Sequence, residues 1–359
     1  MNNPNFSVFN HKKILITGHT GFKGSWLSIW LLLLNADLVG YALEPKTQYD
    51  NYILSHLKSK LKEYIADIRD KNKVFDVVAV EKPEIIFHLA AQPLVLESYK
   101  SALYTIETNV IGTANILEAF RQSESAKLLV IITTDTVYEN SDAIHPFNEN
   151  DRLGGKDTYS ASKAAAELIS TAYRESFFQD NEKTVVTVRA GNVIGGGDWS
   201  EHRIIPDCIK AIENDQKIIV RNPDFIRPWQ FVLEPLGGYL LLASKSLNAE
   251  KHLAGAWNFG PSNNSAMSVI ELVQLIINHY GRGNYQVKRD DSAKKEAVYL
   301  SLDISKAEKQ LNWKPCLTID EAVRQTVDWY KHYKTENMFD YCCKQIDEYE
   351  KQWKLKNLN

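Results

Sequence analysis

The sequence predicts an α/β protein in which a doubly wound parallel sheet is joined to a smaller, loop-rich α/β lobe. Two observations predict the sheet. Short apolar segments alternate with segments long enough for helices over about the first 190 residues, and the first apolar segment ends at a glycine-rich turn. A third observation predicts the lobe, because glycine, proline and asparagine cluster in the sequence after Arg189.

The predicted strands are short apolar runs, and the first of them stops at Gly18, as a buried parallel strand does. They comprise residues 12–17, 38–43, 64–66, 84–90, 128–134 and 184–189. Residues 106–120 and 158–178 have helical spacing. The longest apolar run, residues 26–34, is far shorter than the roughly 20 residues that span a bilayer, so we expect a buried helix there.

Composition argues against several classes of protein. The 42 lysines and arginines nearly balance the 45 aspartates and glutamates, which is not the pattern of a nucleic-acid binder. The four cysteines have no CxxC spacing, so we expect reduced thiols in a cytosolic protein, without a disulfide framework or a metal site. Nothing in the N-terminal residues indicates export. The polar tail, residues 336–359, is expected to form a surface helix.

A glycine-rich turn follows the first predicted strand and opens a helix. Its glycines, Gly18, Gly21 and Gly24, have the spacing G-x-x-G-x-x-G, which differs from the commoner G-x-G-x-x-G. Glycines permit a tight turn and let backbone N–H groups approach a pyrophosphate, which then lies at the positive end of the helix dipole. As a bare string the segment can also be an ordinary turn between strand and helix, but its position favours dinucleotide binding.

An acidic residue follows the second predicted strand, as the dinucleotide hypothesis requires. Glu44 comes about 20 residues after Gly24, where a carboxylate can bind the ribose hydroxyls of the adenosine. The same carboxylate would repel the 2′-phosphate of NADP, so we predict NAD, although Lys23 can partly offset that repulsion. Taken alone, Glu44 is equally well explained as a solvated strand end.

These observations predict the domain organisation. We expect residues 1–190 to form an NAD-binding Rossmann domain and residues 191–359 to form mainly a substrate lobe. Residues 256–260 can return to the sheet as one more strand, so the boundary is expected to be interleaved, with return segments near residues 232–260.

A tyrosine and a lysine lie four residues apart on one face of a predicted helix. In Tyr159-Ser160-Ala161-Ser162-Lys163 the lysine is expected to lower the pKa of the tyrosine, which can then take a proton from a substrate alcohol. The spacing is weak evidence by itself, since Tyr330 and Lys334 repeat it in a region without a glycine-rich turn. We interpret that second pair as a surface pair and the first as catalytic.

The chain resembles the extended short-chain dehydrogenase/reductases in its glycine-rich turn, in the Tyr159/Lys163 pair, and in Asp67-Ile68-Arg69, His88-Leu89-Ala90-Ala91 and Thr108-Asn109. Within that group it is most similar to the CDP-glucose 4,6-dehydratases of bacterial dideoxysugar pathways. The more specific matches are residues 18–26 (GHTGFKGSW), 90–95 (AAQPLV), 189–199 (RAGNVIGGGDW) and 226–230 (IRPWQ), and the likeness covers nearly the whole chain.

The resemblance implies an NAD-dependent lyase that oxidises a hexose at C4, removes water across C5 and C6, and reduces C6. Tyr159 would take the proton of the 4-hydroxyl while hydride leaves C4, and the resulting ketone acidifies the C5 proton. Thr134 matches the family's hydroxyl that bonds the oxygen at C4. Asp135 matches the acid that protonates the leaving 6-hydroxyl, provided that burial raises its pKa.

Two departures from the family pattern affect the base that removes the C5 proton. Thr136 stands where these enzymes usually have lysine and related dehydratases have glutamate, and a hydroxyl accepts a proton poorly near neutral pH. Thr133, Thr134 and Thr136 can also be read as β-branched strand residues without chemistry. Lys156 occupies a position that is usually aromatic, three residues before Tyr159. We hypothesise that Lys156 reaches the sugar and acts as a substitute base or as an oxyanion stabiliser, the alternative being an ordinary solvated lysine.

The resemblance also implies binding residues. Those for the cofactor are Gly18, Thr20, Gly21, Phe22, Lys23, Gly24, Glu44, Asp67, Ile68, Leu89, Ala90, Ala91, Asn109, Thr133, Tyr159 and Lys163. Those for the substrate are Gln92, Asn192, Trp199, Arg203, Arg227, Trp229 and Gln230, since arginine suits a diphosphate and tryptophan a base or sugar face. Phe231 replaces the usual histidine, which weakens the case for CDP in particular.

Two other functions stay open. An NAD-dependent nucleotide-sugar epimerase or 4-dehydrogenase is favoured by Thr136 and opposed by Asp135. A non-catalytic NAD-binding protein is opposed by the joint presence of the turn, Asp135 and the Tyr159/Lys163 pair. The family further implies a homodimer, in which the helices at residues 106–120 and 158–178 pack as a four-helix bundle.

Overall fold

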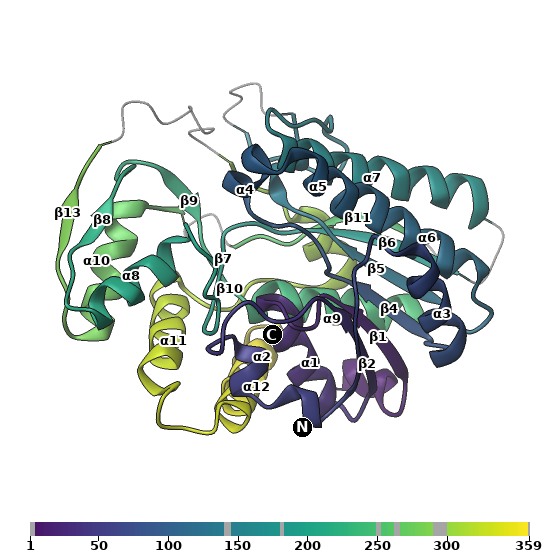
Figure 1. Ribbon diagram of the computed structural model, residues 1–359, viewed down its shortest axis with the longest axis horizontal. Coiled ribbons are helices and arrows are strands. Elements are labelled where there is room, and N and C mark those ends of the chain that lie inside the picture. Colours follow the sequence, from purple (N-terminus) through teal and green to yellow (C-terminus); the bar gives the residue numbers. More distant parts are fainter. Residues whose placement is uncertain are drawn as a thin grey trace.

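A seven-stranded parallel sheet forms the centre of the protein (Figure 1). The computed structural model describes residues 4–139, 145–179, 183–248, 253–261, 266–289 and 300–357. The strand order is β11-β6-β5-β4-β1-β2-β3, and every pairing in the sheet is parallel. The strands are β1 (Lys13–Thr17), β2 (Asp37–Ala42), β3 (Lys62–Ile65), β4 (Ile85–His88), β5 (Leu128–Ile132), β6 (Thr184–Arg189) and β11 (Gly255–Asn258). The doubly wound fold class is therefore confirmed.

The order in which successive strands are added to the sheet reverses between β1 and β4. The strands β2 and β3 follow on one side of β1, whereas β4, β5, β6 and β11 extend on the other. In open α/β sheets, ligands bind in the crevice at the carboxyl ends of the strands where the strand order reverses. The glycine-rich turn lies at the carboxyl end of β1 and therefore at this position.

Helices cover both faces of the sheet and bury its alternating apolar side chains. On one face lie α1 (Phe22–Leu33) and α9 (Leu233–Leu247), whose buried residues share a cluster with Ile14 of β1 and Phe87 of β4. On the other face lie α3 (Lys71–Glu81), α6 (Gly112–Gln122) and α7 (Thr158–Phe177), which pack on Leu15 and Ile86. Neighbouring strand residues point to opposite faces, so Ile14 and Leu15 belong to different layers. Residues 26–34 were predicted to be a buried helix, and α1 confirms this.

The helix predicted at residues 106–120 consists of three segments. They are α5 (Ala102–Ile106), the π-helical segment η3 (Glu107–Ile111) and α6. A wider turn of this kind inside a helix is often found at functional sites. Asn109 lies in η3, and its side chain bonds the backbone of Gln92 and the Oγ of Ser162, so the wide turn faces the predicted cofactor region.

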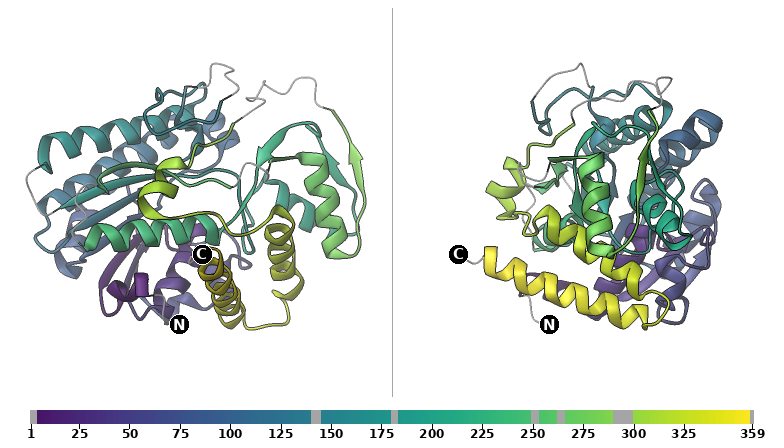
Figure 2. Two further views of the ribbon diagram at one scale, coloured as in Figure 1. Left: turned by 180° about the vertical axis from the view of Figure 1, so that it is seen from behind. Right: turned by 90° about the vertical axis from the view of Figure 1, so that its left-hand side faces the viewer.

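Smaller paired strands and helices form the part of the chain that follows β6 (Figure 2). The pairs are β7 (Val193–Ile194) with β10 (Gln230–Phe231), β9 (Ile226–Pro228) with β12 (Ala266–Ser268), and β8 (Ile218–Val220) with β13 (Tyr285–Val287). The helices here are α8 (Ile204–Glu213), α10 (Val269–Tyr280) and α11 (Ile319–His332). The segments α9 and β11 return to the central sheet. The division at residue 190 stays a prediction, and parts of the predicted lobe lie outside the described residues.

The remaining short elements connect these layers. They are η1 (Pro4–Phe9), α2 (Asn51–Leu54), η2 (Leu57–Ser59), α4 (Val95–Lys100), η4 (Asp135–Val137) and η7 (Ala307–Leu311). Within the described ranges, no helix has both the length and the apolar composition to cross a membrane.

The C-terminal helix corrects the prediction for the tail. α12 (Met338–Asn357) was expected to be a surface helix, but one of its faces is buried. This face carries the side chains of Met338, Cys342, Ile346, Tyr349 and Trp353. Trp353 stacks on Phe6 with ring centroids 5.9 Å apart, which brings the two ends of the chain together, as Figure 1 also shows.

The interpretation of Tyr330 as a surface residue is also wrong. Its side chain is buried, and its hydroxyl donates to the carbonyl of Asp198.

Candidate active site

The glycine-rich turn has a geometry that only glycine allows. Gly18 has φ +76°, and a Cβ there would lie 2.7 Å from the backbone nitrogen of Ala90. A Cβ on Gly24 would lie 2.1 Å from the carbonyl oxygen of Gly18. At these two positions the backbone is therefore packed against other backbone, with no room for a Cβ. Gly21 caps the 12-residue helix α1, whose first N–H groups have no partner within the helix and suit a diphosphate. The turn thus fits a dinucleotide.

The residues predicted to bind the adenosine end lie around β2 and β3. Glu44 is exposed, two residues beyond the end of β2. His19 was not singled out by its sequence, yet its buried ring lies where a Cβ on Gly40 would be only 2.6 Å away. Burial lowers the pKa of His19, although its Nε2 lies 3.1 Å from the Glu63 carboxylate, so the ring is held neutral. An isolated histidine gives no sequence signal for such packing.

Other predicted cofactor residues lie at the carboxyl ends of the parallel strands. Asp67 bonds Arg69 through an ion pair of 2.7 Å, and the Thr133 hydroxyl donates to Glu167 at 2.6 Å. Ile68 is buried next to Gly112. Leu89, Ala90 and Ala91 follow β4, and the hydroxyl of Thr20 donates to the carbonyl of Leu43. The ring of Phe22 lies against Gly195. The structure groups these residues around the turn, and their contacts with a cofactor stay predictions.

Tyr159 and Lys163 lie in the first two turns of α7. Asp157 caps this helix by accepting a bond of 2.9 Å from the backbone of Ser160. A Cβ on Gly155 would lie 2.4 Å from the nitrogen of Ala161, so this glycine lets the chain enter the helix closely. Both predicted catalytic side chains are buried, as expected for a site that excludes water.

The electrostatics of this pair differ from the prediction. Lys163 Nζ donates to the carbonyl of Ile132 at 3.1 Å, and burial lowers the pKa of Lys163 to about 8. Burial raises the pKa of Tyr159 to about 12, and the groups that oppose this rise are Thr134, through a hydrogen bond, and then Arg203, through its charge. Lys163 does not act as the main group lowering the pKa of Tyr159. The spacing within the helix places the two side chains on one face but does not reveal where the ammonium points.

The segment Thr134-Asp135-Thr136 follows β5 and lies beside this pair. Thr134 Oγ1 lies 3.0 Å from Asp135 Oδ1 and 3.4 Å from Thr136 Oγ1, while Asn192 Nδ2 donates to Asp135 Oδ2 at 3.2 Å. Burial raises the pKa of Asp135, as an acid that donates its proton requires. Thr136 offers only its hydroxyl, so it gives the site no proton acceptor.

Two lysines near the site lie in very different environments. Lys156 is exposed on the turn before α7, and the hypothesis that it reaches the sugar has no contact in its favour among the described residues. Burial lowers the pKa of Lys23 to about 7, and the charges of Arg203 and Lys163 act in the same direction, whereas Asp135 opposes them. The ammonium of Lys23 therefore lies within electrostatic reach of the catalytic cluster. The sequence indicated Lys23 only as a cofactor residue.

The predicted substrate residues come from four segments. Arg203 forms an ion pair of 2.7 Å with Asp198. Trp199 is buried against Tyr330 with ring centroids 5.1 Å apart. Gln230 is buried, and its Nε2 donates to the carbonyls of Gly191 and Phe259. The others have these contacts: Trp229 Nε1 donates to Met267, Arg227 donates to the carbonyl of Ile226, Phe231 is buried against Trp26, and Gln92 bonds Leu94 and Thr105. Their roles stay predictions.

Among the described residues, no group of three or more histidine, cysteine, aspartate or glutamate side chains is arranged to hold a metal ion. The four cysteines are free thiols.

Comparison with known proteins gives concordant results. Residues 15–326 match the family described as GDP-mannose 4,6 dehydratase. A CDP-glucose 4,6-dehydratase of Salmonella typhimurium (strain LT2) is 41% identical over 344 residues, which cover 94% of this chain and 96% of that protein. A dTDP-D-glucose 4,6-dehydratase of Mus musculus is 27% identical over 338 residues and 89% of both chains.

Solved structures show the same fold at lower identity. A dTDP-glucose 4,6-dehydratase from Streptomyces venezuelae, solved with NAD and TYD bound, has a TM-score of 0.76 at 22% identity and covers 89% of this chain and 97% of its own. A UDP-glucose 4-epimerase from Thermotoga maritima, solved with UDP-glucose, has a TM-score of 0.76 at 21% identity, with coverages of 89% and 98%.

Proposed function

This chain belongs to the GDP-mannose 4,6-dehydratase family, and we propose from that membership that it is an NAD-dependent nucleotide-sugar 4,6-dehydratase acting on CDP-glucose. The product is CDP-4-keto-6-deoxyglucose, and the enzyme is a hydro-lyase. One observation carries the proposal: Tyr159, Thr134 and Asp135 converge in a buried cluster beside the glycine-rich turn. Support for CDP comes from the Salmonella relative, which at 41% identity is more similar to this chain than the dTDP-D-glucose 4,6-dehydratase of Mus musculus at 27%.

The residues fit NAD as the bound cofactor. Gly18 and Gly24 have no space for a Cβ, so the turn brings backbone close to backbone at the start of α1, where N–H groups suit a diphosphate. Glu44 is exposed beyond the end of β2, where a carboxylate favours the ribose hydroxyls of NAD over the phosphate of NADP. NAD supplies the acceptor and later the donor of the hydride that leaves C4 and returns to C6.

The protein groups perform the proton transfers of the proposed cycle. Tyr159 accepts the proton of the 4-hydroxyl, and its bond to Thr134 and the charge of Arg203 favour the phenolate that this step needs. Asp135 holds a proton at neutral pH more readily than an exposed aspartate, because it is buried, and it donates this proton to the leaving 6-hydroxyl. The Asn192 amide orients the Asp135 carboxyl through Oδ2.

A second candidate function is favoured by Thr136. A nucleotide-sugar epimerase or 4-dehydrogenase uses the oxidation at C4 without removing the C5 proton, and Thr136 offers no base for that removal. A non-catalytic NAD-binding protein is the third alternative. The raised pKa of Asp135 favours the dehydratase over both, because an elimination needs an acid at this position.

Turnover of CDP-glucose tests the proposed function. The purified protein is incubated with NAD and, in parallel, CDP-glucose, dTDP-glucose and UDP-glucose, and products are followed by mass spectrometry. We expect a 4-keto-6-deoxy product, lighter by one water, to form fastest from CDP-glucose. Faster turnover of another nucleotide would overturn the CDP assignment. Exchange at C4 or accumulated NADH without loss of water would establish the second candidate, and no reaction with any sugar would leave the third.

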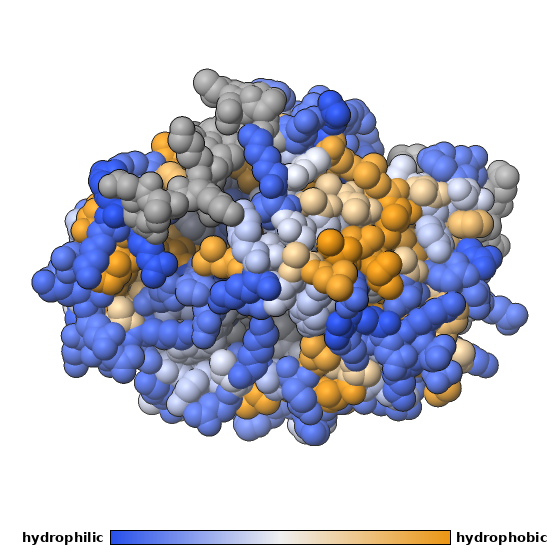
Figure 3. All heavy atoms as spheres, turned by 45° about the horizontal axis from the view of Figure 1, so that its top comes forward, coloured by the Kyte–Doolittle hydropathy of each residue, from blue (hydrophilic) through white to orange (hydrophobic). Residues whose placement is uncertain are grey.

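We also propose that the protein is a homodimer. Exposed apolar side chains gather on α4, α5, η3 and α7, including Leu96, Leu103, Ile106, Ile111 and Leu168. Figure 3 shows a broad apolar patch on this side of the molecule. Such a contiguous patch commonly marks a protein interface, and the family implies that the partner is a second copy packed helix against helix.

A further inference from the structure

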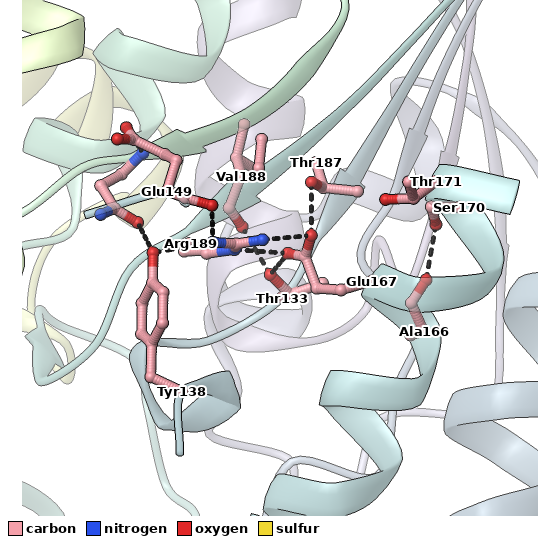
Figure 4. Close-up of polar contacts among 12 residues, drawn as sticks. Thr133, Tyr138, Glu149, Ala166, Glu167, Ser170, Thr171, Thr187, Val188 and Arg189 are labelled. Carbon is pink, nitrogen blue, oxygen red and sulfur yellow. Dashed lines mark hydrogen bonds and ion pairs between the residues drawn. The ribbon is translucent and has the colours of Figure 1, made fainter. Parts of the chain in front are cut away.

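A buried ion pair lies directly behind the candidate active site. The carboxylate of Glu167 and the guanidinium of Arg189 are almost fully buried and form two parallel bonds, Nε to Oε1 at 3.0 Å and Nη2 to Oε2 at 2.9 Å. Thr133 and Thr187 donate their hydroxyls to the same carboxylate, at 2.6 Å and 2.7 Å (Figure 4). A buried charge that is paired bidentately and hydrogen-bonded at both oxygens is held in one geometry.

The pair connects the two segments that carry the proposed catalytic groups with each other and with β6. Glu167 follows Lys163 by one helical turn on α7. Thr133 directly precedes Thr134 and Asp135 at the end of β5. Arg189 ends β6, two residues before Gly191. A rotation of α7 relative to β5 would therefore break the bond between Thr133 and Glu167 and change how Lys163 lies relative to the end of β5.

A second set of bonds holds the far side of the catalytic segment. Arg189 Nη1 donates to the hydroxyl of Tyr138 at 2.8 Å, and that hydroxyl donates to Asn258 Oδ1 at 2.7 Å. Asn258 ends β11, and its backbone N–H donates to Glu149 Oε1 at 2.8 Å. Tyr138 follows η4 directly, so the segment that contains Asp135 is anchored before it by Thr133 and after it by Tyr138. Figure 4 shows Tyr138 bonded to Arg189 and Thr133 bonded to Glu167, the ion-pair partner of Arg189.

We propose that Glu167 is a positioning residue, which together with Arg189 fixes Lys163 of α7 and Asp135 of η4 at the separation that the reaction needs. The inference rests on the proposed function and deepens it, because it assigns a task to charged groups that do not touch the substrate. A structural ion pair elsewhere in the protein would stabilise the fold without setting the geometry of the site.

Charge supplies a second consequence of the same contact. The charge of Glu167 raises the pKa of Lys163 and so opposes the lowering by burial. Other titratable groups near Lys163 or the pair are His88 of β4, Lys23 of α1, Tyr138, Glu149, Arg174 and Lys306. Without the charge of Glu167, Arg189 is left without its counter-ion. Both effects lower the pKa of Lys163, so its proton is lost at lower pH.

Two substitutions of one residue separate position from charge. Glu167→Gln keeps the size and removes the charge, whereas Glu167→Asp keeps the charge and withdraws it by one methylene group. We expect both variants to lower kcat for dehydration roughly tenfold or more, with KM for CDP-glucose within about twofold. The alkaline limb of the pH profile of kcat/KM is expected to move down by about one pH unit in Glu167→Gln and to stay in place in Glu167→Asp.

The matched control is Glu81→Gln. Glu81 is also a buried carboxylate, bonded to Tyr64 and paired with Lys62, but its partners are not site residues. The control is expected to lose stability while keeping kcat and the pH profile. The inference would be overturned if Glu167→Gln kept the wild-type kcat and the wild-type alkaline limb of the pH profile of kcat/KM. It would also be overturned if Glu167→Gln and Glu81→Gln, compared at equal folded fractions, lost the same share of their activity.

A measurement without substrate distinguishes this inference from the proposed function. The rate at which acetic anhydride acetylates Lys163 is followed against pH by peptide mass spectrometry, which reports the titration of that amine. We expect Glu167→Gln, but not Glu81→Gln, to shift the titration to lower pH. If the wild type turned over no nucleotide sugar and the shift still appeared, the proposed function would fail while the electrostatic coupling of Glu167 to Lys163 would stand. If the wild type turned over nucleotide sugar but Glu167→Gln showed neither a shifted Lys163 titration nor a lower rate, the proposed function would stand and the inference about Glu167 would fail.

A further variant covers the case in which Glu167→Gln does not fold. Thr187→Val keeps the ion pair and removes one hydrogen-bond donor to Glu167 Oε2. We expect kcat to fall roughly threefold with KM unchanged. Wild-type kcat in a folded Thr187→Val protein would then overturn the inference.

Discussion

Gly191 provides the space in which the Asp135 carboxylate lies. A Cβ at this position would be 1.7 Å from Asp135 Oδ2, far inside any tolerated contact. The backbone of Gly191 is held in two places. Arg189, two residues earlier, is paired with Glu167, and the carbonyl of Gly191 itself accepts a bond from Gln230. The absence of one side chain therefore decides where the proposed acid lies.

Substitution of Gly191 by alanine is expected to displace Asp135 and to slow the loss of water by about 100-fold, because a displacement of about 1 Å in a reacting group has an effect of that size. The affinity for NAD should change little, and the two are measured by product formation and by equilibrium binding. Gly260→Ala is the control, because a Cβ there would meet only ordinary contacts of 3.4 Å or more. Equal rates in the two variants would show that Asp135 is not displaced.

Lys23 and Lys156 give opposite expectations for the base that removes the C5 proton. Lys23 lies in the electrostatic field of Asp135 and has a pKa of about 7, so a large fraction is deprotonated near neutral pH, whereas Lys156 is exposed. We expect Lys23→Met to lower the incorporation of solvent deuterium at C5 about 100-fold at saturating NAD. Lys156→Ala should keep wild-type exchange. If Lys156→Ala lost the deuterium exchange at C5 and Lys23→Met kept it, Lys156 would be the base.

The helix α12 illustrates how an element with a polar composition can belong to the core. Its apolar residues recur every three or four positions, which places them on one face against α1, η1 and α9. The Tyr349 hydroxyl donates to Glu234 of α9 at 2.9 Å, and Trp30 of α1 donates to Glu350 at 2.8 Å. The sequence prediction failed here because it weighed average polarity more than periodicity.

Ile346→Ala measures the contribution of this helix to stability. Ile346 is fully buried, and truncation of such a side chain costs about 2–5 kcal/mol through lost burial and the cavity that remains. Leu355→Ala, in the same helix but 71% exposed, should change the free energy of unfolding by less than about 0.5 kcal/mol. Denaturant titrations of both variants test the expectation. Similar losses in the two would mean that α12 is not anchored by its buried face.

Glu234 makes the stability of this region depend on pH. The side chain is buried, and burial raises its pKa from 4.5 to about 7, although the backbones of Cys316 and Leu317 and the Tyr349 hydroxyl donate to it. The folded state then binds the proton more tightly than the unfolded state. This stabilisation is complete below about pH 4.5 and is lost as the pH rises through 7.

We therefore expect the wild type to lose stability relative to Glu234→Gln between pH 5 and pH 8, by at most about 3 kcal/mol. The difference between the two proteins is measured by denaturant unfolding at several pH values, which removes the contribution of all other titrating groups. A constant difference across this range would show that Glu234 titrates normally.

The assembly of two copies can be tested with a pair of equally exposed residues. Leu103 of α5 and Val80 of α3 are each 68% exposed, but only Leu103 lies on the apolar patch of the proposed dimer. We expect Leu103→Glu to shift the protein to a monomeric mass in analytical ultracentrifugation, because a charge would be desolvated in the interface, while Val80→Glu stays dimeric. A monomeric wild type would contradict the proposed dimer itself.

The sequence predicted the sheet well, because each of six strands is a distinct apolar run and the structure moves their ends by only one or two residues. It did not predict the π-helical segment at Glu107–Ile111, in which Asn109 makes contacts with Gln92 and Ser162. These contacts join residues far apart in the chain, and local spacing carries no signal for them.

The candidate site was predictable where a motif is local and unpredictable where it depends on packing. The spacing of Tyr159 and Lys163 and the glycines of the turn could be read directly. The bond from Lys163 to Ile132, the place of Lys23 near Asp135 and the ion pair of Glu167 with Arg189 could not. Each of these depends on burial and on the juxtaposition of separate strands.

The late return of β11 to the sheet has a consequence for biosynthesis. The chain leaves the sheet after Arg189 and comes back only at Gly255, where β11 pairs with β6. At about 5–20 residues per second, a ribosome needs roughly 3–13 s to make this interval. During that time β6 is an uncovered strand edge, which is a template for pairing with other nascent chains. Chaperone occupancy on the growing polypeptide is therefore expected to be greatest while this interval is being translated, and slow codons there would favour aggregation.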